Sequence, residues 1–256
     1  MLLDDKVCLI TGVSAESGIG FATAELFAAS GARLAILDVQ LDDQRIAALS
    51  GRIADLAGRP IEVLGYKCDL TDDVACKSVV SDIVARFGRI DVLVHSAGIV
   101  RTQSTLEMSK GDFSRMLEVN LTGTFNINQP VLSQMVLQGS GSIINVASVA
   151  AQRGGGLVGG SHYAASKGGV VSFTKSIARE YGGNGVRANA ICPSLIETPM
   201  LQGVTSEQMS QLTKSIPLAR PGRPSEMAAA CLFLASNLSS FITGATLDVN
   251  GGLHIH

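Results

Sequence analysis

Several features that would assign the chain to whole classes of protein are missing from its 256 residues. Tryptophan is absent, and 20 Lys and Arg residues against 22 Asp and Glu residues leave a formal net charge of −2. The basic residues are scattered along the sequence rather than gathered in a stripe, which argues against nucleic acid as a partner. No stretch approaches the roughly 18 uninterrupted apolar residues that a membrane helix needs. We therefore expect neither nucleic-acid nor membrane binding.

Cysteine is also too sparse and too widely spaced to build a disulfide framework or a metal site. The five cysteines are odd in number and form no CxxC pair, and they are Cys8, Cys68, Cys76, Cys192 and Cys231. Two aspartates precede the first apolar run, so no signal-peptide pattern opens the sequence. Together these features predict a cytoplasmic protein with reduced cysteines and no bound metal.

What is present is a regular alternation of apolar runs with segments of helical periodicity. Continuous apolar strands joined by helices are typical of a parallel sheet that is covered on both faces. No Pro/Gly/Ser linker divides the chain, and residues 150–162 are better interpreted as a mobile loop beside a site. We predict one α/β domain over residues 1–256, with a doubly wound sheet of about seven strands. The major helices are expected at residues 21–30, 42–56, 74–87, 113–137, 163–181 and 224–234.

A glycine-rich loop joins the first predicted strand to the first predicted helix. Gly12, Gly18 and Gly20 lie in "ITGVSAESGIG". Such a turn allows backbone amides to approach a pyrophosphate at the start of a helix. Five residues separate Gly12 from Gly18, where three are usual, so Ser14 and Ser17 are possible extra donors.

Asp38 predicts which dinucleotide this loop would bind. It ends the second predicted strand, 18 residues beyond Gly20, where a carboxylate can accept hydrogen bonds from the adenosine ribose hydroxyls. The same carboxylate would repel a 2′-phosphate. No arginine or lysine follows Asp38 directly, and the loop "VSAES" has none. NAD(H) is therefore favoured over NADP(H).

Eight motifs in order resemble the short-chain dehydrogenase/reductase (SDR) family, and they span nearly the whole chain. They are "TGVSAESGIG", "CDL", "HSAG", "VNLTG", "INVAS", "YAASK", "CPSLIETPM" and "ITGATLDVNGG". The resemblance implies a Rossmann-type fold, a nicotinamide cofactor and hydride transfer at a carbon that bears a hydroxyl or carbonyl group. It extends to 3-oxoacyl carrier-protein reductases and to polyol and alcohol dehydrogenases.

Four residues are the candidate catalytic group. Tyr163 and Lys167 are four apart on a predicted helix and share a face. The ammonium, helped by the positive nicotinamide ring of the cofactor, could then stabilise a phenolate and lower the pKa of the phenol. Ser148 follows an apolar strand at its carboxyl end, where its hydroxyl could bond a substrate oxygen. The resemblance implies that Asn120 holds a water that links Lys167 to solvent.

The resemblance also implies a set of cofactor contacts along the chain. Asp69 would bond the adenine amino group with Leu70 beside the ring, while Val119 is a weaker candidate nearby. The full set comprises Gly12, Ser14, Ser17, Gly18, Ile19, Asp38, Asp69, Leu70, Ala97, Gly98, Tyr163, Lys167, Pro193, Ile196 and Thr198. The last three would meet the nicotinamide and its carboxamide.

Three positions depart from the family pattern. The longer glycine loop resembles that of enoyl reductases, but their Tyr–Lys spacing is wider than that of "YAASK", which favours alcohol or ketone chemistry. His95 stands where the family more often has an asparagine that ties neighbouring strands, so we interpret it as a structural substitute. Ser194 replaces a usual glycine and raises a question about the backbone conformation there.

The C-terminal residues His254 and His256 would face the same way on a strand. Without a carboxylate or cysteine partner they are more typical of a chain end than of a metal site. In several tetramers of the family this end reaches a neighbouring subunit. A homotetramer is expected here, built from the helices that begin near Phe113 and Tyr163 and from a second contact near residues 224–234.

The expected substrate is a small secondary alcohol or ketone, with a sugar, polyol or cyclic alcohol favoured. A 3-oxoacyl-[acyl-carrier-protein] reductase is the alternative, although Arg101, Lys110 and Arg153 make only a thin basic patch for a carrier. A non-catalytic NAD-binding sensor or scaffold is an alternative of another class. Residues 199–216 are expected to form a lid over the substrate.

Overall fold

The centre of the structure is a parallel sheet of seven strands. The computed structural model describes residues 1–58, 60–156, 158–201 and 203–256. The strand order is β3-β2-β1-β4-β5-β6-β7, and every pairing is parallel. The strands are β1 (Val7–Thr11), β2 (Arg33–Asp38), β3 (Val63–Lys67), β4 (Val92–His95), β5 (Gly141–Val146), β6 (Val186–Pro193) and β7 (Thr246–Val249). This confirms the predicted doubly wound, Rossmann-type α/β fold.

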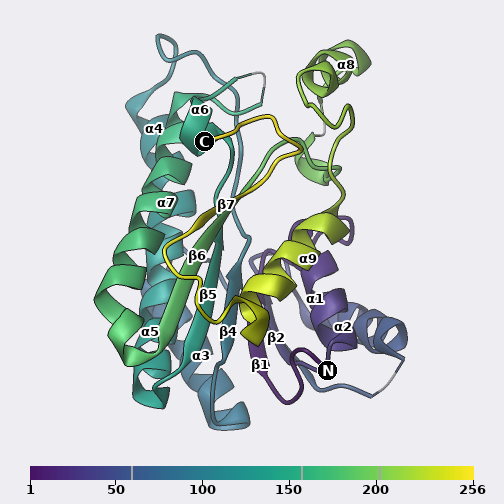
Figure 1. Ribbon diagram of the computed structural model, residues 1–256, viewed down its shortest axis with the longest axis vertical. Helices are drawn as coiled ribbons and strands as arrows, with labels where there is room; N and C mark the ends of the chain where they lie inside the picture. The colour runs from purple at the N-terminus through teal and green to yellow at the C-terminus, as the bar shows by residue number, and fades with distance from the viewer. Residues whose placement is uncertain (59, 157, 202) are drawn as a thin grey trace.

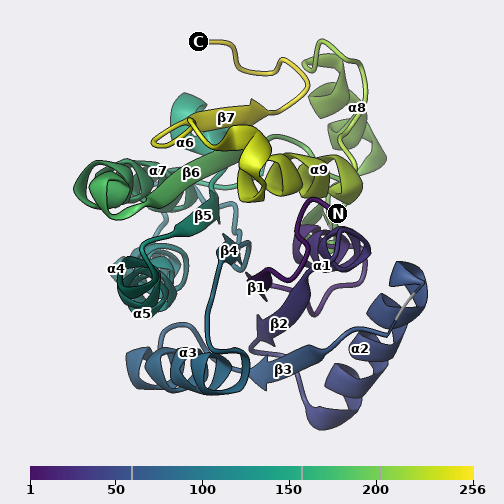
Figure 2. The ribbon, with the colours of Figure 1, turned by 60° about the horizontal axis from the view of Figure 1, so that its bottom comes forward.

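The helices lie in two layers on the faces of this sheet. Figure 2 shows α1, α2 and α9 on one face and α3, α4, α5 and α7 on the other. They are α1 (Ile19–Ala29), α2 (Asp43–Ala57), α3 (Asp73–Phe87), α4 (Lys110–Leu117), α5 (Gly123–Gln138), α7 (Ser161–Tyr181) and α9 (Pro224–Ala235). Two further helices, α6 (Ala150–Arg153) and α8 (Ser206–Lys214), lie beyond the carboxyl ends of the strands (Figure 1).

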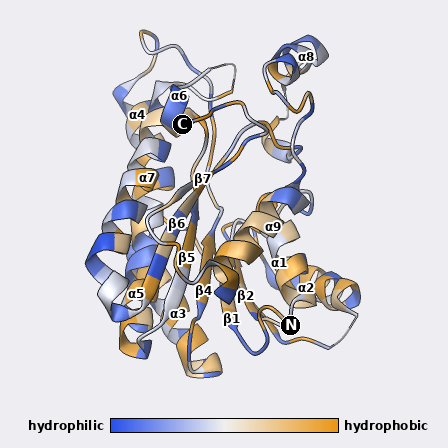
Figure 3. Cartoon of the chain, in the orientation of Figure 1, coloured by the Kyte–Doolittle hydropathy of each residue, from blue (hydrophilic) through white to orange (hydrophobic). Residues whose placement is uncertain are grey.

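Alternate residues of each strand enter two separate cores, because side chains along a strand point to opposite faces. In β1, Cys8 and Ile10 pack on the side of α1 and α9, whereas Val7 and Leu9 pack on the side of α3 and α5. All four are fully buried. Figure 3 shows apolar residues along the central strands and hydrophilic ones over the outer helix surfaces. This burial on both faces explains why the strands read as continuous apolar runs.

The helix predicted at residues 113–137 differs from the observed one. The structure has α4, a π-helical turn at Glu118–Thr122 and then α5, in one continuous run. A π turn inserts an extra residue into a helix and is frequent at functional sites. The sequence analysis did not predict this π turn.

The loop and the lid expected near the site contain short helices. Residues 150–162 include α6, and residues 199–216 include a 3₁₀ turn (Pro199–Leu201) and α8. Position 157 of the loop and position 202 of the lid lie outside the described residues. In the part of the chain that is described, no helix combines the length and apolar character needed to cross a membrane.

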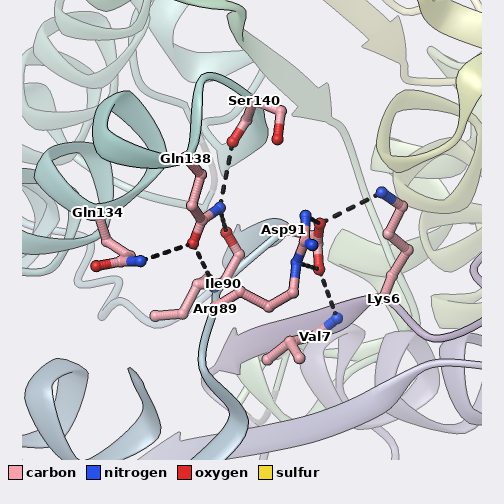
Figure 4. A network of polar contacts seen from close by, with 8 residues as sticks. All are labelled: Lys6, Val7, Arg89, Ile90, Asp91, Gln134, Gln138 and Ser140. Carbon is pink, nitrogen blue, oxygen red and sulfur yellow. Dashed lines mark hydrogen bonds and ion pairs between the residues drawn. The ribbon is translucent and has the colours of Figure 1, made fainter. Parts of the chain in front are cut away.

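A buried polar network closes the amino ends of β1, β4 and β5, opposite the functional edge (Figure 4). The Asp91 carboxylate accepts from the Val7 amide at 2.9 Å, from Arg89 at 2.6 and 2.9 Å and from Lys6 at 3.3 Å. The side chain of Gln138, at the end of α5, bonds both the amide and the carbonyl of Ile90. These contacts join the termini of β1, β4 and α5 without using any candidate site residue.

Candidate functional site

The candidate site lies at the carboxyl edge of the sheet, where loops from several strands surround one cavity. Its volume is about 340 Å³. The strand order reverses between β1 and β4, and crevices at such a reversal are where doubly wound sheets bind ligands. Members of the predicted set that line this cavity are Ile19, Gly98, Ser148, Tyr163, Lys167, Pro193, Ile196 and Thr198.

The glycine loop is compact because glycine is sterically required at two of its positions. Gly12 has a φ of +77°, and a Cβ there would lie 2.7 Å from the Ala97 nitrogen. A Cβ on Gly20 would lie 2.2 Å from the Gly12 carbonyl oxygen. The first turn of α1 therefore packs directly against the end of β1. These glycines are therefore required by the packing of the loop itself, and phosphate binding at the helix start stays a prediction.

Asp38 holds the long loop against the end of β2. Its carboxylate is 8% exposed and accepts from the Ser14 amide and the Gln40 amide, each at 3.0 Å. The hydroxyl of Ser14 faces Gln40 at 3.5 Å, while Ser17 is exposed. Asp38 thus anchors the loop, and each of its oxygens keeps a lone pair for a further donor.

Two arginines of α2 reach the same loop, which the sequence argument missed. Arg45 donates to the carbonyl oxygen of Ser14, and Arg52 pairs with Glu16. The sequence argument considered only the loop itself and the residues directly after Asp38, so it did not find these two guanidinium groups. Arg45 is seven positions beyond Asp38 in sequence, and only the packing of α2 on the sheet brings its guanidinium to the loop. The two extra loop residues are fixed by these side chains.

The turn after β3 contains Asp69 and Leu70, the two residues that are predicted to bind adenine. The Asp69 carboxylate accepts from the Thr71 amide at 2.9 Å and from its hydroxyl at 2.8 Å through Oδ1, and these bonds lower its pKa. Leu70 is buried, and its carbonyl accepts from Asn126 of α5 at 2.8 Å. The backbone of this turn is thereby tied to both β3 and α5.

Ser148, Tyr163 and Lys167 converge on the cavity from β5 and α7. Tyr163 is partly buried and hydrogen-bonded to Ser148. Lys167 is almost fully buried, and its Nζ donates to the Val146 carbonyl at 2.8 Å. The end of β5 therefore positions both partners of Tyr163, one through its hydroxyl and one through its backbone.

Burial changes the acidity of these groups in ways the sequence does not show. It lowers the pKa of Lys167 to about 8, because the charged ammonium loses its hydration. Burial also raises the pKa of Tyr163, and the Ser148 hydrogen bond only partly opposes this. The sequence argument expected the Lys167 ammonium, helped by the positive nicotinamide ring of the cofactor, to lower the pKa of the phenol. In the protein by itself, burial has the largest effect and raises that pKa.

Asn120 is buried inside the π turn and holds the loop that follows β4. Its Oδ1 accepts from the Ile99 amide at 2.8 Å, and its Nδ2 donates to the Ile99 carbonyl at 2.9 Å and to Ser166 at 3.1 Å. A Cβ on Gly98 would lie 3.0 Å from Asn120 Oδ1 and 3.4 Å from Lys167 Nζ. Gly98 therefore lets the loop pass close to both side chains. Ala97, beside it, donates from its amide to the Thr11 hydroxyl at 3.3 Å.

Gly159 is a positioning residue that the sequence argument did not single out. Its φ is +85°, and a Cβ there would lie 2.5 Å from the Tyr163 ring. Its amide donates to the Thr102 hydroxyl at 3.0 Å. The glycine-rich composition of residues 154–160 was the available signal, but composition does not tell which glycine packs against the tyrosine.

The departures at His95 and Ser194 are accommodated locally. The Nδ1 of His95 bonds the Thr11 hydroxyl at 2.9 Å, so His95 ties β4 to β1, as expected of a structural substitute. Burial, with a smaller effect of the Lys167 charge, lowers its pKa to about 3 and keeps the ring neutral. Ser194 does not adopt the left-handed conformation, and its hydroxyl donates to the Asn250 carbonyl at 2.8 Å.

One wall of the cavity comes from β6 and from the lid segment. Pro193 is the last residue of β6, and Ile196 is buried and bridges to Gly222. From the described lid residues, Met200, Leu201, Leu212, Ser215 and Ile216 also line the cavity. This wall is largely apolar and faces Ser148 and Tyr163.

Comparison with known proteins identifies the family to which this chain belongs. The model of a family described as "Enoyl-(Acyl carrier protein) reductase" matches residues 12–254. An uncharacterized short-chain type dehydrogenase/reductase, y4mP, of Sinorhizobium fredii is 42% identical over 100% of both chains. The chain belongs to the short-chain dehydrogenase/reductase family. It is an oxidoreductase of that family, whose members use a nicotinamide cofactor.

Other SDR relatives differ in the substrate that their names give. The 3-oxoacyl-[acyl-carrier-protein] reductase FabG of Thermotoga maritima is 42% identical over 100% of both chains. The D-threitol dehydrogenase of Mycolicibacterium smegmatis is 40% identical over 99% of this chain and 94% of its own.

Solved SDR structures superpose closely on this one. Levodione reductase matches with a TM-score of 0.91 and 35% identity over 98% of each chain. NAD⁺-bound xylitol dehydrogenase matches with a TM-score of 0.89 and 29% identity, over 98% of this chain and 100% of its own.

Proposed function

We propose that this SDR protein transfers a hydride between NAD(H) and a small secondary alcohol or ketone. The convergence of Ser148, Tyr163 and Lys167 on one apolar-walled cavity supports this proposal most directly. A phenol, a hydroxyl and a buried ammonium provide acid–base chemistry at an oxygen atom.

In the oxidation, the Tyr163 phenolate removes the proton of the substrate hydroxyl, and in the reduction the phenol returns it. The Ser148 hydroxyl donates to the substrate oxygen and stabilises the charge that develops there. When bound, the nicotinamide cofactor accepts or supplies the hydride. Lys167 holds positive charge near the phenol, and we propose that Asn120 links Lys167 to solvent through a water. The raised pKa of Tyr163 makes it a strong base once deprotonated.

The glycine cradle and Asp38 fit a dinucleotide at the same edge. Gly12 and Gly20 allow the end of β1, the first turn of α1 and the Ala97 backbone to approach closely, where a Cβ would clash. The remaining lone pairs of Asp38 suit ribose hydroxyls and oppose a 2′-phosphate, which supports NAD(H) over NADP(H). The likeness to an NAD⁺-bound xylitol dehydrogenase supports the same preference. In this proposal Asp69 and Leu70 bind adenine, Ala97 and Gly98 border adenosine, and Pro193, Ile196 and Thr198 meet the nicotinamide.

A second candidate is reduction of a 3-oxoacyl group on a carrier protein. The 42% identity to a relative named for that reaction favours it. Against it, Asp38 disfavours a phosphorylated cofactor, and Arg101 is engaged in an ion pair with Asp112 at 3.0 Å, which thins the basic patch further. A non-catalytic NAD-binding sensor would have no use for the three converging side chains.

The deciding experiment is a panel of polyols, cyclic secondary alcohols and a 3-oxoacyl thioester, each assayed with both cofactors. We expect turnover of at least one alcohol or its ketone, with a larger kcat/KM for NAD(H). Turnover of the thioester alone with NADPH would instead assign the second candidate. NADH binding without turnover of any compound would support the sensor.

A further inference from the structure

Two C-terminal histidines and a carboxylate meet on the outer side of β7. Their ligand atoms, from Asp248, His254 and His256, all lie within 4.8 Å of one another. His256 Nε2 is 3.3 Å from Asp248 Oδ2. The rings of His254 and His256 pack edge to face, with 4.8 Å between their centroids. The sequence argument against a metal was that the histidines lack a carboxylate partner, and the fold supplies one from the preceding strand.

The chain turns back on itself to make this cluster, and the turn is well fixed. Gly251 and Gly252 have φ values of +67° and +86°, a conformation that other residues rarely adopt. The Asn250 side chain accepts from the Gly252 amide at 2.9 Å and donates to the His254 carbonyl at 3.1 Å. Arg153 of α6 donates to the Leu253 carbonyl at 2.9 Å. The histidines are therefore held beside Asp248 by contacts other than their own rings.

In the absence of a cation, His256 Nε2 cannot form hydrogen bonds with both Gln152 and Asp248. Gln152 Nε2 donates to Asp248 Oδ1 at 2.7 Å and lies 3.2 Å from His256 Nε2. Facing Gln152, that ring nitrogen needs a lone pair, whereas facing Asp248 it needs a proton. Gln152 Oε1 is buried without a hydrogen-bond partner among the described residues. A cation between the ring nitrogen and the carboxylate would satisfy both, and the Gln152 amide could then turn its oxygen toward the centre.

We propose that Asp248, His254 and His256 bind a first-row divalent cation such as Zn²⁺. Two imidazoles and one carboxylate are a donor set that suits zinc, with bonds of about 2.0–2.2 Å and one position left for water. Tetrahedral ligand atoms at such bond lengths lie roughly 3.4 Å apart, so the cluster closes with small side-chain rotations. Gln152 supports the site by orienting Asp248 and His256.

The bound ion would fix a wall of the substrate cavity. Leu253 of the tail and Arg153 of α6 both line that cavity, and Gln152 connects α6 to the cluster through Asp248 and His256. Figure 1 shows the C-terminus beside α6 at this end of the molecule. The ion stands apart from Ser148 and Tyr163 and takes no part in hydride transfer. Its role is to hold the tail against β7.

The test is metal binding by the untagged, chelator-treated protein, because an added histidine tag would itself bind the probe. Co²⁺ is titrated and followed by its visible d–d absorption, and Zn²⁺ is then added as a competitor. We expect one Co²⁺ per chain, displacement by Zn²⁺ and a higher Tm with Zn²⁺ present. The Asp248→Asn and His254→Ala variants should bind about 100-fold more weakly or not at all, and Gln152→Ala about tenfold more weakly.

Asp55→Asn is the matched control, since Asp55 is an exposed carboxylate on α2 and should leave the titration unchanged. Equal binding by the wild type and the Asp248→Asn variant would overturn the proposal. So would the lack of saturable binding by the wild type, or half an ion per chain, which would place the site between two copies. The readout is independent of turnover, so its failure leaves the proposed oxidoreductase function untouched.

Discussion

Two glycines without reactive groups let the proposed acid–base residues take their places. Gly98 allows the loop after β4 to pass beside Asn120 and Lys167, and Gly159 allows residues 158–160 to pack on the ring of Tyr163. A side chain at either position would need the space that these residues occupy. At the residue scale, the site thus depends on the lack of a side chain at these two glycines as well as on its functional groups.

Gly159→Ala should impair catalysis by displacing Tyr163. The new methyl group would clash with the ring, and the φ of +85° is strained for alanine by about 1–2 kcal/mol. We expect kcat to fall by roughly 10- to 100-fold, because small misplacements of reacting groups are costly, with NADH affinity little changed. Gly156→Ala is the control, since a Cβ there meets nothing and its φ is not left-handed. Equal kcat values for the two variants would contradict this account.

Because burial lowers the pKa of Lys167, the free energy of unfolding should increase as the pH rises from 8 to 10.5. Its pKa is about 8 in the folded protein and about 10.5 when unfolded, so the unfolded chain binds more protons between these values. The Lys167 contribution is therefore most favourable above pH 10.5 and is lost as pH falls through 8, by about 3 kcal/mol. Urea unfolding of wild type and Lys167→Met measures it. The free energy of unfolding of wild type relative to the variant should rise from pH 8 to 10.5, and a constant difference would refute the shift.

At the scale of elements, side chains of β2 and α2 hold the long glycine loop in place. Asp38 accepts a hydrogen bond from the amide of Ser14, and Arg45 donates one to the carbonyl of the same residue. Arg52 forms an ion pair with Glu16 of the loop. Two extra residues would otherwise leave the loop free to move. These anchors explain how a loop longer than usual can remain close to the start of α1.

Cofactor preference should follow the charge at this junction. The double variant Asp38→Ala, Val39→Arg removes the repelling carboxylate and adds a guanidinium at a half-exposed position. We expect the ratio of kcat/KM for NADP to that for NAD to rise by about 10- to 100-fold, the effect of one charge-assisted hydrogen bond. The Arg45→Ala variant is the comparison, and it should weaken both cofactors alike. A wild type that already prefers NADP would show that Asp38 was misinterpreted.

The sequence predicts elements well where periodicity and order decide, and poorly where packing decides. All seven strands follow from apolar runs, and Ser148, Tyr163 and Lys167 meet because strand ends and one helix face bring them together. The π turn around Asn120 has no periodic signature. Arg45 reaches the glycine loop only because α2 packs beside it, and Asp248 meets the histidines only because the chain turns back at Gly251 and Gly252. The raised pKa of Tyr163 likewise depends on burial, which the sequence does not show.

At the scale of the whole molecule, several large apolar side chains are exposed to solvent in the single chain. Phe125 of α5 and Phe173 of α7 meet edge to face at 6.1 Å on the outer surface, where Phe125 is 43% exposed. Phe241, between α9 and β7, is fully exposed, and Leu238 is 66% exposed. Large exposed apolar clusters on a folded protein are typical of interfaces. They support the proposal of a homotetramer with two kinds of contact.

Light scattering at micromolar concentration tests that assembly. We expect a particle of about four times the 26.6 kDa chain mass. Replacing Phe125 by Glu should break one contact and yield dimers, because a carboxylate cannot be buried unpaired in an apolar interface. Replacing Lys175, an exposed residue of α7, by Gln is the control for altered surface charge. A wild type that is monomeric and fully active would reject the tetramer.

The account as a whole depends on Tyr163 as the group that moves the proton. The most direct measurement compares wild type with Tyr163→Phe in two assays, NADH binding by fluorescence and turnover of the best alcohol or ketone from the panel. The substitution keeps the ring and its packing against Gly159 and removes only the hydroxyl. We predict nearly unchanged NADH affinity and a loss of turnover of at least about 100-fold, the usual contribution of a positioned acid–base group. Turnover within about tenfold of wild type would contradict the mechanism.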